Sequence, residues 1–162
     1  MRQVLLSTLF ATACLLAPAI AAAEEPLRIQ DPIPLVDGRR IDPEIIESCD
    51  IQRGFTDALV RQMKGRIVAV PGPLDTSKGR ALEIEIDDTD WSGNWFIGHV
   101  QLIRTHGTLY ADGRKVASFT GVRNLRGDLT SACYNLTVGF RAHAWDIKRW
   151  LKDPVDGKQI GR

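Results

Sequence analysis

Residues Val100–Arg123 read VQLIRTHGTLYADGRKVASFTGVR, and this segment indicates how the chain folds. Asp112-Gly113 stands between two runs, Val100–Tyr110 and Lys115–Arg123, that are rich in β-branched and aromatic residues. An Asp-Gly pair between such runs is typical of a tight β-hairpin, because both positions accept a positive φ. We therefore predict two antiparallel strands joined at this pair.

Further strands precede the hairpin. Residues 82–87, LEIEID, alternate apolar and acidic side chains, which predicts a strand with one face in water. Arg66–Val70 is mainly apolar and is followed by Pro-Gly-Pro, which is typical of a short buried strand. Within Glu24–Arg40, the prolines of Asp31-Pro32-Ile33-Pro34 limit any strand to a short one or an edge one.

A first helix is predicted from Asp42-Pro43-Glu44, where Asp can act as the N-cap and Pro suits the first turn. Apolar residues then recur at spacings of mostly three or four, at Ile45, Ile46, Cys49, Phe55, Leu59 and Met63. The pattern predicts one buried stripe that ends at Lys64-Gly65. Gly54 weakens its middle, so the alternative is a helix that begins only near Cys49–Asp50.

A final helix has the clearest pattern in the chain. Its apolar stripe consists of Cys133, Leu136, Phe140, His143, Ile147, Trp150 and Leu151. Thr130 or Ser131 can cap its start, and Asp153-Pro154 ends it, with residues 155–162 as a loop. This order of elements predicts an α+β fold, in which two helices pack on one face of an antiparallel-rich sheet.

Met1–Ala23 has the properties of a secretory signal peptide. Arg2 comes first, an apolar stretch follows over residues 4–17, and Ala21–Ala23 offer a cleavage site near Ala23. The alternatives are a membrane anchor, for which the stretch is short, and lipidation at Cys14, which lacks the usual upstream Leu. We expect residues 24–162 to form a single domain in the periplasm or outside the cell, with no membrane span.

Processing would leave two cysteines, Cys49 and Cys133. An even number in an oxidising compartment predicts a disulfide, and only one intramolecular pairing exists; two buried free thiols are the alternative. The bridge would join the two helices at one end of the sheet. No Cys-x-x-Cys or His-x-x-x-His occurs, so neither a metal nor another cofactor is expected.

The charge of the chain argues against nucleic-acid binding. It has 21 Lys+Arg and 20 Asp+Glu, and residues 1–23 contain one of the basic residues and no acid. The remainder is therefore balanced, whereas a nucleic-acid binder needs a basic face. Nucleophile and phosphate-loop motifs are missing, and the acids of Asp87–Asp90 resemble a calcium loop only at its start. The sequence therefore favours a protein without catalytic activity.

One short segment is a candidate binding surface. Trp91, Asn94, Trp95 and Phe96 gather aromatic and amide side chains around a glycine, as in an exposed recognition loop. The alternative is that Trp95 and Phe96 begin a strand and pack inward.

Several of these features resemble a group of uncharacterised small exported proteins of Gram-negative bacteria. The shared pattern is Cys…Trp-Ser-Gly…Cys…Asp…Trp-Leu, here Cys49, a turn at Asp90–Gly93, Cys133, Asp146 and Trp150-Leu151. The order of elements is also similar to that of YajG-like envelope lipoproteins. The resemblance implies an envelope location and a role in binding or assembly, and it carries no catalytic residue.

Together these observations predict a non-catalytic periplasmic or secreted protein that binds an envelope protein or polymer. One alternative is a small hydrolase or inhibitor that acts on envelope polymers, with Asp87–Asp90 near its site. Another is a structural protein that forms oligomers through an exposed sheet edge.

Overall fold

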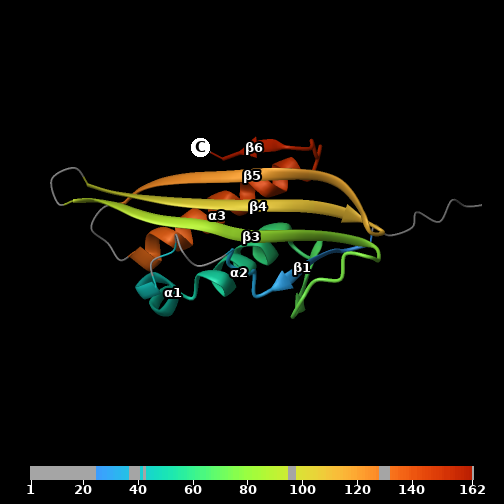
Figure 1. Ribbon diagram of the computed structural model, residues 1–162, viewed down its shortest axis with the longest axis horizontal. Helices are drawn as coiled ribbons and strands as arrows, with labels where there is room; N and C mark the ends of the chain where they lie inside the picture. The colour runs from blue at the N-terminus through green and yellow to red at the C-terminus, as the bar shows by residue number, and fades with distance from the viewer. Residues whose placement is uncertain (1–24, 37–40, 42, 95–97, 128–131, 162) are drawn as a thin grey trace, which may run out of the picture.

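The structure is a computed structural model, and it describes residues 25–36, 41, 43–94, 98–127 and 132–161. Its strands are β1 (Leu27–Asp31), β2 (Ile67–Pro71), β3 (Arg80–Asn94), β4 (Gly98–Ala111), β5 (Arg114–Gly127) and β6 (Lys158–Ile160). Its helices are α1 (Pro43–Cys49), α2 (Ile51–Met63) and α3 (Ala132–Trp150). The strands form one sheet in the order β2-β1-β3-β4-β5-β6, and the helices lie together on one face of it (Figure 1).

The sheet is mixed, so the prediction of an antiparallel-rich sheet is wrong. β1 pairs in parallel with β2 and β3, and β6 pairs in parallel with β5, whereas β3, β4 and β5 form an antiparallel meander. The cause lies in the connections, because α1 and α2 come between β1 and β2, and α3 comes between β5 and β6. A helix that crosses one face of a sheet returns the chain to begin the next strand in the same direction.

Strand β6 corrects the expectation that residues 155–162 form a loop. It contains only three residues, KQI, and so short a segment has no recognisable hydrophobic period. It becomes a strand because α3 returns the chain to the edge of β5, where it pairs with Phe119–Gly121. Ile160 is 8% exposed and closes the core at this edge.

The β4–β5 hairpin is confirmed. Asp112 and Gly113 form its turn with φ values of 50° and 77°, as a two-residue hairpin loop requires. The turn expected at Asp90–Gly93 is wrong, because β3 continues to Asn94 and stays paired with β4. Hydrogen bonding between β3 and β4 continues through this segment and outweighs the local turn preference of the Ser-Gly pair.

Two helices replace the single helix expected over residues 42–64, so three helices of the described residues cover the sheet where two were expected. Asp50 separates α1 from α2, with φ 43° and ψ 50°. Asp tolerates this left-handed conformation better than most residues. Gly54 does not interrupt α2, and a Cβ built on it would lie 3.7 Å from the Phe140 ring, which is an ordinary packing distance.

The core lies between the helices and the sheet. Phe55 of α2 stacks on Phe140 of α3, with ring centroids 5.2 Å apart. Phe119 of β5 meets Trp150 of α3 edge-on at 4.9 Å. These aromatic contacts fix how α3 lies against α2 and against the sheet, and the C-terminal end of α3 helps to form the site described below.

Cys49 and Cys133 form the expected disulfide, with an S–S distance of 2.00 Å. It links the last residue of α1 to the second residue of α3. The alternative of two free thiols is therefore wrong. The expected caps of α3, Thr130 and Ser131, lie outside the described residues.

Candidate functional site

A half-open pocket of about 700 Å³ lies where the start of β1, the end of α2 and the end of α3 meet. Leu27, Met63 and Ile67, each 4% exposed, form its floor. Leu151, just after α3, adds a partly buried apolar side chain. The pocket therefore combines buried apolar side chains with the charged side chains described next.

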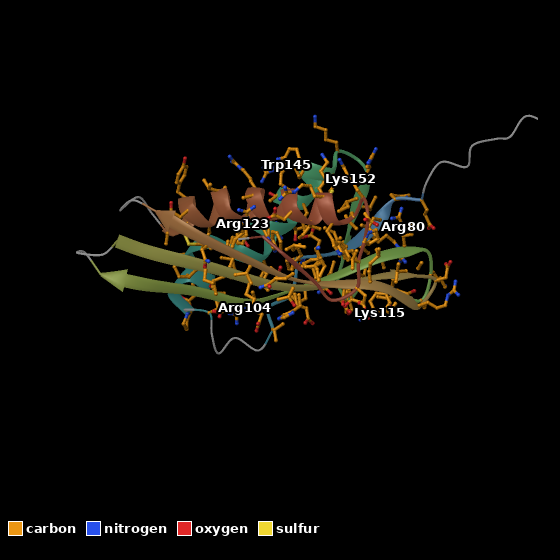
Figure 2. The ribbon with its side chains drawn as sticks, turned by 90° about the horizontal axis from the view of Figure 1, so that it is seen from above. Arg80, Arg104, Lys115, Arg123, Trp145 and Lys152 are labelled. Atoms are coloured by element: carbon orange, nitrogen blue, oxygen red, sulfur yellow. A yellow bond between two sulfur atoms is a disulfide. The ribbon has the colours of Figure 1, made fainter. Side chains whose placement is uncertain are left out.

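The rim of the pocket is basic. Its charged residues are Arg66, Arg80, Lys148 and Lys152, with Glu25 as the acid. Figure 2 shows Arg80 and Lys152 at the same end of the molecule. Two helices also end here, and each helix C-terminus carries a partial charge of about −0.5. The four cations, the one carboxylate and the two helix ends together give the pocket a net charge of about +2. The pocket therefore attracts anions.

Lys148 has a structural contact as well as a place on the rim. Its Nζ donates a hydrogen bond of 3.0 Å to the carbonyl oxygen of Gln62, in the last turn of α2. The same atom lies 5.2 Å from the centroid of the Trp145 ring. Lys148 thus links the end of α2 to the end of α3. The other three cations, Arg66, Arg80 and Lys152, come from three segments that are distant in the sequence and meet only in the folded chain.

A second polar group lies between α3 and the sheet, away from the pocket. Asp146 is 2% exposed and accepts hydrogen bonds from Arg123 Nε at 2.8 Å and Arg149 Nη2 at 2.5 Å. His143 is fully buried, and its Nε2 is 2.6 Å from Thr105 Oγ1. The buried side chains of His143 and Asp146 hold α3 against β4 and β5 through these contacts.

His143 should make the stability of the protein depend on pH. Burial lowers its pKa to about 4, although the Asp146 carboxylate acts in the opposite direction. In the unfolded chain the pKa of His143 is about 6.5. Between the folded and the unfolded pKa, the unfolded state therefore binds more protons than the folded state. We expect the free energy of unfolding to fall by about 3 kcal/mol as the pH is lowered through this window.

Urea unfolding at a series of pH values measures this loss. His143→Gln keeps a hydrogen-bonding side chain that does not titrate, and should lose much less stability over the same window. An equally steep loss in His143→Gln would show that other groups cause it.

The predicted recognition residues lie far from the pocket. The backbone of Trp91 and Asn94 is at the end of β3, where they pair with Gln101 and Gly98, whereas Trp95 and Phe96 lie outside the described residues. From Arg80 to Trp91 the strand extends about 36 Å, at about 3.3 Å per residue. The aromatic segment and the basic pocket are therefore separate places on the molecule.

The acids singled out from the sequence form separate pairs on β3 and β4. Asp87 Oδ2 lies 3.2 Å from His106 Nε2, and Asp88 Oδ2 lies 3.6 Å from Arg104 Nη1. Within the described residues, no three Asp, Glu, His or Cys side chains gather as a metal site would require. The same part of the chain contains no helix that is both long and apolar enough to span a bilayer.

Sequence reasoning missed the pocket completely. Its cations come from the α2–β2 turn, the start of β3 and the end of α3. Lys148 and Lys152 share a spacing of four, and this was the one local signal that a basic side of α3 existed.

Comparisons with known proteins show a similarity of fold to solved structures. No protein-family model and no curated protein matches the chain. A solved structure described as an uncharacterized protein is 13% identical, with a TM-score of 0.53, and the match covers 78% of this chain and 92% of that one.

Two further solved structures are less similar. Protein XCC0632 from Xanthomonas campestris, of the family DUF330, is 18% identical with a TM-score of 0.46, covering 84% of this chain and 86% of that chain. A minor lipoprotein from Acinetobacter baumannii is 11% identical with a TM-score of 0.41, covering 79% and 92%. The likeness to the first structure shows that the chain shares a known fold.

Proposed function

We propose that this chain is an exported, non-catalytic binding protein of the cell envelope, and that it holds an anionic ligand with an apolar part in the basic pocket. The observation that carries the proposal is the basic rim, with Arg66, Arg80 and Lys152, above the floor of Leu27 and Met63. The rim would bind the anionic group, and the floor would bury the apolar part of the ligand.

Two features of the chain support binding over catalysis. The cations of the rim are Arg and Lys side chains, which hold anions by charge and by hydrogen bonds from their N–H groups. The group with the large pKa shift, His143, lies in the core beside Thr105 and not in the lining of the pocket.

The proposed export rests on the signal peptide predicted over residues 1–23. Trp91–Phe96 remain a proposed second contact, for an envelope protein or polymer.

The proposal can be tested with a pair of fluorescent probes. Anilinonaphthalene sulfonate has a sulfonate on an apolar ring system, and phenylnaphthylamine has the same ring system without the charge. We expect the sulfonate to bind at least about tenfold more tightly, since a hydrogen bond to a charged group contributes about 1.5–3 kcal/mol. The double variant Arg66→Gln/Lys152→Gln should lose about tenfold in affinity for the sulfonate and little for the neutral probe.

Arg114→Gln/Lys115→Gln is the matched control. It removes one Arg and one Lys from exposed positions at the hairpin turn, and Figure 2 shows Lys115 on the side of the sheet away from α3. This control should bind the sulfonate like the unmodified protein. Equal affinity for both probes, or equal losses in the two double variants, would contradict the proposed pocket function.

A further inference from the structure

The outer side of α3 carries a straight line of aromatic, aliphatic and cationic side chains. We call it the outer stripe, and it consists of Tyr134, Val138, Arg141, Trp145, Lys148 and Lys152. Successive members are four or three positions apart, so they share one side of the helix, and Lys152 continues the line just past its end. At about 1.5 Å per residue the stripe extends for about 27 Å.

The apolar members of the stripe are exposed. Tyr134 is 62% exposed, Trp145 is 54% exposed and Val138 is 41% exposed. Figure 2 shows Trp145 and Lys152 on the side of α3 that faces away from the strands. Lys148 Nζ lies 5.2 Å from the Trp145 ring centroid while it is bonded to Gln62, so the ring is held at the surface.

The charge of the stripe has one sign. It contains Arg141, Lys148 and Lys152, and the single acid of α3, Asp146, is 2% exposed and paired with Arg123 of β5. Rings of Tyr and Trp beside Lys and Arg are the combination that stabilises a helix lying flat on a membrane–water interface. The long stems of Lys and Arg cover apolar surface while their charges reach anionic headgroups.

We propose that the outer stripe docks the protein on an anionic membrane surface. Arg141 and Lys152 would contact the headgroups, and the Trp145 ring would lie among them. Docking would turn the sheet away from the membrane and bring the basic pocket close to its surface. The inference goes beyond the pocket function. The stripe shares Lys148 and Lys152 with the pocket, and its test therefore uses Arg141 and Trp145, which do not line the pocket.

The test uses the protein isolated from cells that express the full chain. Its binding to vesicles of phosphatidylcholine, with and without phosphatidylglycerol, is measured by co-sedimentation. We expect binding only to the vesicles with phosphatidylglycerol, and a loss of binding in high salt. Arg141→Glu should weaken it by at least about tenfold, because each cation near an anionic surface contributes about fivefold and the variant reverses one charge. Trp145→Ala should weaken it by about tenfold, and Trp145→Phe should restore most of the loss.

Arg114→Glu is the matched control, since it makes the same charge change at an exposed residue of the hairpin turn. It should change the affinity for anionic vesicles by less than about threefold. Equal losses in Arg141→Glu and Arg114→Glu, or equal binding to neutral vesicles, would overturn the proposal. Binding to polyglutamate without binding to vesicles would also overturn it, and would point to an acidic protein surface. Binding of anilinonaphthalene sulfonate should be unchanged in Arg141→Glu, so failure of the stripe and failure of the pocket are distinguishable.

Discussion

Removal of the Cys49–Cys133 bridge should lower the free energy of unfolding by up to about 4–5 kcal/mol. The two cysteines are 84 positions apart, and a cross-link that closes so long a loop removes much of the conformational entropy of the unfolded chain. Urea unfolding of Cys49→Ala/Cys133→Ala measures the loss. α1 should also lose protection in hydrogen exchange, because a helix of seven residues is too short to persist without its tertiary contacts.

The reductant dithiothreitol provides the control for this prediction. It should destabilise the unmodified protein by about as much as the double variant is destabilised, and it should have no effect on the double variant. A double variant as stable as the oxidised protein would mean that packing alone holds α1 in place.

Asp146→Ala should lower the free energy of unfolding by about 3–5 kcal/mol, which is the usual result of breaking a buried ion pair by removing one partner. The carboxylate is 2% exposed and accepts hydrogen bonds from Arg123 and Arg149. Without it, Arg123, whose side chain is only 25% exposed, would face a space with no anion. Arg149 is 67% exposed and can turn to water, which places the expected loss at the lower end of the range.

Asp57→Ala is the matched control for Asp146→Ala. Asp57 pairs with Arg61 at 3.7 Å on the surface of α2, where it is 57% exposed. Exposed pairs of this kind contribute less than about 0.5 kcal/mol, so the control should unfold almost like the unmodified protein. Similar losses in both variants would show that the Asp146 network does not hold α3 on the sheet.

Local sequence patterns were sufficient to predict the elements whose stabilising contacts are close in sequence. The Asp112-Gly113 turn was predictable because its backbone conformation depends on those two residues. The stripe of α3 was predictable because an amphipathic period is a local property. Predictions were wrong where the structure depends on residues that are distant in the sequence. Asp90–Gly93 has the composition of a turn, yet pairing with β4 keeps it extended.

The candidate site could not be predicted at all. Arg66 directly precedes β2 and Arg80 is the first residue of β3, and neither has a sequence neighbour that suggests a ligand. They become one site with Lys152 only because β1, β2 and β3 start at the same end of the sheet where α3 ends. The predicted aromatic contact at Trp91–Phe96 remains a prediction, since Trp95 and Phe96 lie outside the described residues.

The amino-acid sequence by itself determined the hairpin, the last helix and the one possible disulfide pairing, because short-range backbone preferences and the count of cysteines are enough for these. Only the tertiary structure decided that the sheet is mixed, that residues 158–160 form an edge strand, and that four cations meet above an apolar floor. The physical reason is that crossover connections determine strand direction and bring remote residues together, and no period within a single element records where a crossover ends.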